Sequence, residues 1–157
     1  MSTLTLRVEK YIFSLFSEKL DVNYTYHNLV HTQKVVEKVI ELSEDLKLDE
    51  LTVENLQIAA WFHDAGFIKG TKNHEEESVR IFTHFINEEK LDVKRIELIS
   101  NLILATKIGH NPNNDLEKII VDADCAHLGS KSFEDRLSLL RKEWEFNCDE
   151  KYSDGDW

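Results

Sequence analysis

The sequence contains few residues that break helices, with one proline and five glycines in 157 residues. The many turns of a β-sandwich or a β-barrel depend on these residues, so the composition disfavours both architectures. A chain of this length is long enough to bury a real core as one domain. We therefore expect a single all-α domain over residues 1–157.

Cysteines and long apolar runs are also scarce. The two cysteines, Cys125 and Cys148, are too few for a disulfide framework and fit a reducing compartment. The sequence has no apolar run long enough for a membrane span and no signal peptide. We expect a soluble cytoplasmic protein without a membrane partner. The abrupt end of the acidic tail at Trp157 suggests a cut in a longer protein.

Basic residues are outnumbered, with 19 Lys and Arg against 30 Asp and Glu and a formal net charge of −11. The basic residues are interspersed with acidic ones and form no stripe along the sequence. Such a surface repels polyanions, so nucleic acid is not expected as a partner. A small anionic ligand would need a local cationic site, such as a metal ion. Nothing in the sequence predicts the oligomeric state.

Apolar residues recur at helical spacing along most of the chain, and this pattern predicts a bundle of six or seven helices. The predicted helices cover approximately residues 3–20, 26–46, 52–64, 73–86, 93–106, 115–128 and 132–144. We expect Ser2 or Thr3 to cap the first helix, Asn73 to cap the fourth and Ser132 to begin the last. Residues 67–69 are expected to form a loop at the mouth of a cleft.

The most informative stretch is Trp61-Phe62-His63-Asp64-Ala65-Gly66, at the end of an apolar helical run. A buried ionised aspartate needs a partner, and a metal cation is one of the few that compensates it fully. Neighbouring residues on a helix point about 100° apart. His63 and Asp64 can therefore share one ion only at a helix end near a cleft.

Two other predicted helices carry candidate ligands. His27 and His31 are four residues apart on the inward face of their helix, a spacing that suits core histidines as well as metal or catalytic ones. Asp124 lies on an apolar stripe, whereas Asp122 points to the opposite side. The alternative for Asp124 is a buried acid satisfied by the backbone or an arginine. Cys125 is expected to be a small core residue.

Taken in chain order, His31, His63-Asp64 and Asp124 resemble the signature of the HD-domain superfamily of metal-dependent phosphohydrolases. The resemblance covers residues 26–144 and implies an HD-domain helical bundle in which these four residues bind one divalent ion. Mixed imidazole and carboxylate ligands suit Mn, Fe, Zn, Ni or Co better than Mg alone. Two ions are also possible in such a site, with His74 and His110 holding the second.

Further segments resemble particular branches of the superfamily. Residues 26–31 are similar to the segment of cyclic-nucleotide phosphodiesterases in which the first histidine donates a proton and the second binds metal. His74-Glu75 is similar to the catalytic pair of deoxynucleotide triphosphohydrolases. Residues 105–110 and 122–129 look like a bacterial branch of predicted metal-dependent HD phosphohydrolases, which often has Asn in place of His74. The purine-clamping glutamine of the phosphodiesterases has no counterpart here, so cyclic nucleotides are not implied.

The resemblance implies hydrolysis of a small phosphomonoester or nucleotide by hydroxide generated on the metal ion. His27 or His74 would protonate the leaving oxygen, and Lys107 would neutralise a phosphate oxygen, with Glu75 and His110 completing the catalytic set. One alternative is a sensor or effector module that binds metal or nucleotide without turnover. Another is a di-iron oxygenase, a chemistry that some HD proteins perform. The outer set of residues favours an enzyme, because a pure binding module has little reason to retain it.

Overall fold

The protein folds into helices, as the scarcity of turn-forming residues predicts. The computed structural model describes residues 2–87, 89, 91–129, 133–148, 151–153 and 155, and no strand occurs among them. The prediction of an all-α domain is confirmed. In chain order the elements are α1 (Thr3–Lys19), α2 (Leu29–Asp45), α3 (Glu50–Phe62), the short 3-10 helix η1 (Ala65–Lys69), α4 (His74–Ile86), α5 (Val93–Ala105), α6 (Asp115–Asp124), the 3-10 helix η2 (Cys125–Gly129) and α7 (Phe133–Cys148).

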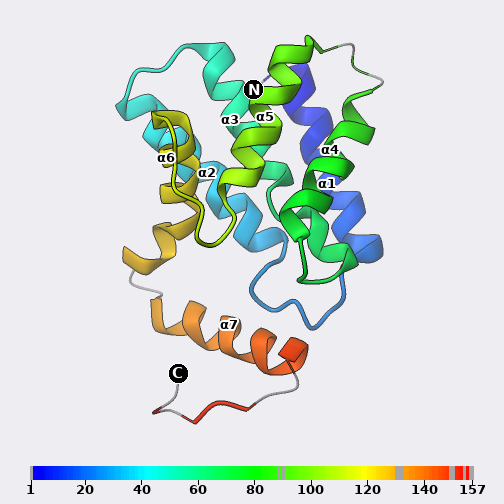
Figure 1. Ribbon diagram of the computed structural model, residues 1–157, viewed down its shortest axis with the longest axis vertical. Coiled ribbons are helices and arrows are strands. Elements are labelled where there is room, and N and C mark those ends of the chain that lie inside the picture. Colours follow the sequence, from blue (N-terminus) through cyan, green and yellow to red (C-terminus); the bar gives the residue numbers. More distant parts are fainter. Residues whose placement is uncertain are drawn as a thin grey trace.

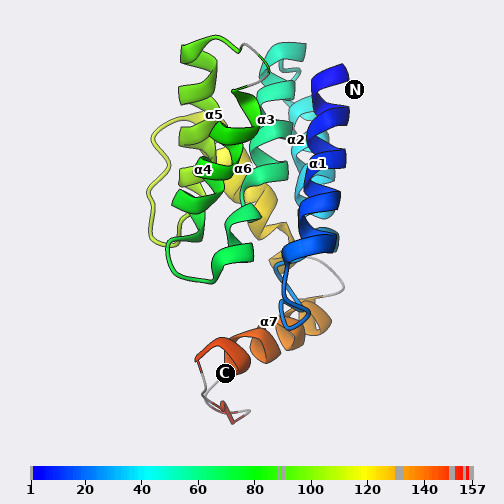
Figure 2. The same cartoon turned by 90° about the vertical axis from the view of Figure 1, so that its right-hand side faces the viewer.

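Helix α3 is the centre of the fold. Every residue from position 55 to 62 is buried, and the helix contacts α1, α2, α4, α5 and α6. The surrounding helices stand side by side around it, with α1 and α2 on one side and α4 and α5 on the other (Figure 2). Ala59 and Ala60 are fully buried, and their small side chains allow close approach of these neighbours. A helix whose residues from 55 to 62 are all buried requires this central position.

Helix α7 lies apart from this bundle, across one end of it (Figure 1). It contacts η2, and its described links to the bundle run to the segment that precedes α2 and to His31 in the first turn of α2. Thr25 Oγ1 donates to the Leu139 carbonyl oxygen at 2.8 Å. The buried carboxylate of Glu143 accepts hydrogen bonds from the backbone N–H groups of Tyr26 and His27 at 2.8 and 2.9 Å. Helix α7 therefore fixes the segment that carries His27.

Capping residues move two of the predicted helix boundaries. Asn28 caps α2 by accepting from the Val30 N–H, so the helix begins at Leu29 and not at residue 26. His27 consequently precedes the helix, and its predicted place on the helix face is wrong. Asp49 caps α3, which begins two residues earlier than predicted. Of the two candidate caps for α1, Ser2 is the one that accepts from Thr5 N.

Three local predictions also differ from the structure. Residues 67–69 belong to the 3-10 helix η1, whose Phe67 is buried, and not to a loop. Asn73 occupies the N-cap position of α4, but its left-handed backbone (φ 54°) leaves the side chain without a capping hydrogen bond. Cys125 is exposed, because α6 changes to the 3-10 helix η2 at that residue and the apolar stripe is not continued. Ser132 lies outside the described residues.

No helix among the described residues combines the length and the apolar character that crossing a membrane requires.

Close packing of η1 against α4 holds the turn that follows α3. Ser78 on α4 accepts a hydrogen bond from the Gly66 N–H and donates one to the His63 carbonyl oxygen, both at 2.8 Å. A Cβ at Gly66 would lie 1.9 Å from the His74 carbonyl oxygen. Only glycine therefore permits this approach between the backbones of η1 and α4.

We predict that Gly66→Ala lowers the free energy of unfolding by about 1–3 kcal/mol, because overpacking forces η1 and α4 apart. Gly129→Ala is the matched control, since a Cβ there meets no atom within 4 Å. Its effect should stay within about 0.5 kcal/mol. Urea unfolding of both variants makes the comparison, and equal effects of the two substitutions would contradict the packing argument.

Candidate metal centre

Four side chains from three distant parts of the sequence meet where three helix ends come together. His31 lies in the first turn of α2, His63 is the C-cap residue of α3 and Asp64 follows it, and Asp124 is the last residue of α6. His31 Nε2 lies 3.0 Å from Asp124 Oδ1 and 3.3 Å from both His63 Nε2 and Asp64 Oδ2. His63 Nε2 lies 3.0 Å from Asp64 Oδ2 and 3.5 Å from Asp124 Oδ1. The predicted convergence is confirmed.

These separations match those between ligands of one metal ion. Ligand bonds of about 2.0–2.2 Å that meet at about 90° to 109° place neighbouring ligand atoms about 2.8–3.6 Å apart. All five distances, from 3.0 to 3.5 Å, fall in this range. One candidate ligand atom each from His31, His63 and Asp124 lies within 4.8 Å of the others. Asp64 joins this group through its contacts with both imidazoles.

The hydrogen bonds around the cluster fit an ion better than they fit a closed protein network. His63 Nδ1 lies 2.7 Å from the Ala60 carbonyl oxygen and donates to it. Neutral His63 therefore presents a lone pair, and no N–H, at Nε2. Asp64 Oδ2 is buried beside this lone pair and has no hydrogen-bond partner. A cation between the two atoms satisfies both, and the same backbone bond keeps the imidazole oriented.

The pKa values of the four side chains are shifted in the directions that favour positive charge on the imidazoles and negative charge on the carboxylates. Burial disfavours the protonated forms of His31 and His63, but the neighbouring carboxylates outweigh it and raise the pKa of both, that of His63 to well above its usual range. Burial also disfavours ionised Asp64 and Asp124, yet the two imidazoles hold the pKa of both carboxyl groups below its usual range. Protons must leave the imidazoles before an ion binds them.

Three of the five predicted outer residues, His27, His74 and Glu75, lie around the cluster. The Phe67 ring contacts both outer imidazoles, with centroid distances of 4.3 Å to His27 and 4.0 Å to His74. His74 Nε2 lies 3.8 Å from Asp64 Oδ1 and 3.5 Å from Glu75 Oε1. The His74 Nδ1–H donates to the Thr71 carbonyl oxygen at 3.1 Å. His74 and buried Glu75 therefore border the cluster on the Asp64 side.

The other two predicted outer residues have partners elsewhere. Lys107 forms an exposed ion pair with Glu76, whose hydrogen bond raises the pKa of the lysine. His110 Nε2 lies 2.9 Å from Glu117 Oε2. Among the described residues, no hydrogen bond or ion pair joins Lys107 or His110 to the four candidate ligands. Their catalytic roles stay predictions.

Three residues that the sequence analysis did not assign a role also adjoin the cluster: Tyr26, Arg136 and Glu143. Arg136 Nη2 lies 3.2 Å from His31 Nδ1, and its guanidinium lies 4.6 Å from the centre of the Tyr26 ring. Glu143 forms an ion pair with His27 Nδ1. Arg136 and Glu143 are seven residues apart, two turns on one face of α7, but on so charged a helix this spacing does not distinguish them from exposed residues.

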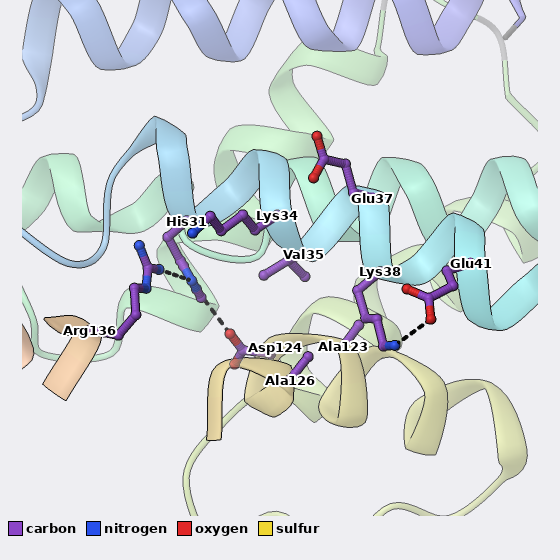
Figure 3. Close-up of a pocket in the computed structure, with 10 residues that line it drawn as sticks. All are labelled: His31, Lys34, Val35, Glu37, Lys38, Glu41, Ala123, Asp124, Ala126 and Arg136. Atoms are coloured by element: carbon purple, nitrogen blue, oxygen red, sulfur yellow. Dashed lines mark hydrogen bonds and ion pairs between the residues drawn. The ribbon is translucent and has the colours of Figure 1, made fainter. Parts of the chain in front are cut away.

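A cavity of about 210 Å³ adjoins the cluster between α2, the end of α6 and α7 (Figure 3). The Asp124 side chain, 25% exposed, borders it, whereas His63 and Asp64 are buried behind. The cavity gives a small molecule access to the candidate ligands. Its lining residues are His31, Lys34, Val35, Glu37, Lys38, Glu41, Ala123, Asp124, Ala126 and Arg136.

The fold and the cluster together define a helical domain with a mixed imidazole and carboxylate metal centre. The HD domain family matches residues 28–129, which include all four candidate ligands. The chain belongs to the HD-domain family, whose members are generally metal-dependent phosphohydrolases. The match does not distinguish the branches of the superfamily. Comparisons with curated proteins and with solved structures found no significant match.

We predict that Asp124→Ala weakens binding of Mn²⁺ by at least about a hundredfold, because loss of groups that only orient the ligands already costs about 10- to 100-fold. Asp122→Ala is the matched control, since Asp122 is an exposed residue of the same helix. It should bind Mn²⁺ like the parent. Titration calorimetry measures both affinities. If Asp122→Ala loses the ion and Asp124→Ala keeps it, the assignment of the last ligand is reversed.

Proposed function

We propose that the protein is a divalent-metal-dependent phosphohydrolase that acts on a small phosphomonoester or nucleotide. The observation that carries this proposal is the position of His27 and His74, which adjoin the four candidate ligands and whose Nδ1 atoms are held by other partners. His27 keeps Nε2 for proton transfer, and His74 Nε2 faces the carboxylates of Asp64 and Glu75, with which it can exchange a proton. A site that only stored a metal ion would not need these two groups.

The four candidate ligands provide the charge that a divalent cation needs. Two carboxylates balance its charge, and two neutral imidazoles favour a transition ion over Mg²⁺. An ion held there supplies a hydroxide nucleophile near neutral pH and draws charge from a phosphoryl oxygen. The proposal leaves the metal as Mn, Fe, Zn, Ni or Co and allows a second ion. Metal analysis of the purified protein identifies the metal and counts the ions.

His27 is the proposed proton donor for the leaving oxygen. Its Nδ1–H donates to the buried Glu143 carboxylate, which fixes the tautomer and the ring orientation. Among the described residues, no hydrogen-bond partner occupies His27 Nε2. This nitrogen is therefore available to the substrate. His74, with Glu75 beside it, is the second group that can carry a proton at the site.

Charge and size support a small substrate. The net charge of −11 disfavours polynucleotides. The cavity of about 210 Å³ is smaller than the roughly 300–1,000 Å³ of common ligand pockets. It has room for a phosphoryl group and for part of the leaving group of the ester. Cleavage of long oligonucleotides without activity on mononucleotides would contradict this choice of substrate.

We predict that His27→Ala retains Mn²⁺ and lowers kcat on a phosphomonoester by about 10²–10³-fold, because general acid catalysis is lost. His84→Ala is the matched control, since His84 is an exposed histidine on the outer side of α4. It should retain the parent rate. The measurement is metal content and hydrolysis of p-nitrophenyl phosphate and 5′-nucleotides on the same samples.

The outcome that would replace this proposal is a parent protein that binds the ion and the nucleotide but hydrolyses no ester in the panel. That result would favour the non-catalytic sensor. Oxygen consumption in the presence of Fe²⁺, without ester hydrolysis, would favour the oxygenase.

A further inference from the structure

We propose that Arg136 of α7 binds the phosphoryl group of the substrate and that Lys34 of α2 assists it. This inference rests on the proposed function for the identity of the ligand, a phosphate ester. It extends the site beyond residues 28–129, the part that the family match covers.

Arg136 is a buried cation without an anionic partner. Only 6% of the residue is exposed, and among the described residues no carboxylate forms an ion pair with it. Its contacts are the Tyr26 side chain, by a hydrogen bond and through the ring, and His31 Nδ1. Its Nε is buried and has no hydrogen-bond partner. A buried charge in this state is costly unless an anion joins it.

Arg136 lines the same cavity as two of the candidate metal ligands. Arg136, His31 and Asp124 lie at the same end of it, and the Arg136 guanidinium points toward the His31 ring (Figure 3). Lys34 lines the same cavity, and among the described residues it forms no hydrogen bond or ion pair. Lys38, the other lining lysine, is paired with Glu41 at 2.7 Å. Arginine suits a phosphate because its planar fork donates two parallel hydrogen bonds.

An alternative role for Arg136 is purely structural, as an anchor of α7 on Tyr26. The two roles differ in what the substitution changes. An anchor contributes to stability and leaves the affinity for phosphate alone. A phosphate-binding residue changes that affinity even in a variant that folds normally and binds Mn²⁺ normally.

The experiment measures binding of inorganic phosphate to the Mn²⁺-loaded protein by titration calorimetry. Arg136→Gln should weaken phosphate binding by about 10- to 100-fold, the value of one or two charged hydrogen bonds, with Mn²⁺ affinity unchanged within about threefold. Lys34→Gln should weaken phosphate binding less, because Lys34 is exposed. The control is Arg141→Gln on the same helix, where the guanidinium pairs with Glu145 at 3.1 Å. It should bind phosphate like the parent.

If folded Arg136→Gln binds phosphate as tightly as the parent, the proposal is overturned and Arg136 is only a structural anchor of α7. If Arg136→Gln does not fold, Arg136→Lys decides. It keeps the charge but loses the fork, so its phosphate affinity should fall severalfold, and an unchanged value would overturn the proposal. A parent that binds Mn²⁺ but no phosphate would also overturn it. Phosphate binding that depends on Arg136, in a protein that hydrolyses no ester, would support this proposal and contradict only the hydrolase.

Discussion

The rest of the structure depends on one constraint: two imidazoles and the Asp64 carboxylate are buried, the partly exposed Asp124 carboxylate adjoins them, and their lone pairs face one another. Such an arrangement is unstable in a protein interior unless positive charge lies between the groups. Burial opposes charge on these groups, but the neighbouring carboxylates outweigh it and raise the pKa of His63, and the imidazoles outweigh it and lower the pKa of Asp64. A divalent ion bound here would supply the positive charge and would satisfy Asp64 Oδ2, the atom that has no hydrogen-bond donor.

The fold supplies this constraint with a rigid frame. Helix ends present the ligands, because only there can consecutive residues such as His63 and Asp64 reach one point. The backbone of the central helix orients His63 through Ala60. Ser78 and the glycine at position 66 then fix the turn against α4, which carries His74. Helix α7 completes the opposite side by holding His27 through Glu143.

Sequence reasoning identified the four candidate ligands because each is a polar residue where the helical pattern calls for an apolar one. It did not locate His27 correctly. The i, i+4 spacing of His27 and His31 suggested one helix, whereas Asn28 caps α2 and the helix begins at Leu29. The partners of Lys107 and His110 could not be predicted either. Glu76 is 31 residues from Lys107 in sequence, and such an exposed pair depends on how α4 and α5 are placed.

The roles of Arg136 and Glu143 could not be predicted from the sequence for a different reason. On a helix as rich in charged residues as α7, a buried arginine and a buried glutamate have the same sequence pattern as solvent-exposed ones. Only their position beside Tyr26 and His27 distinguishes them. The residues proposed to contact the substrate thus lie mainly where the helical pattern is least informative, whereas the candidate metal ligands follow from that pattern.

The central claim is that these four side chains exist to hold one divalent ion. The most direct test is thermal unfolding of the parent protein after chelation, with and without added Mn²⁺, together with the stoichiometry of binding. At a free concentration 100 times Kd, one bound ion should stabilise the folded state by about 2.7 kcal/mol and raise Tm accordingly. A stoichiometry of at least one ion per chain with this rise supports the claim. An unchanged Tm, with none of Mn²⁺, Fe²⁺, Zn²⁺, Ni²⁺ or Co²⁺ bound, would contradict it.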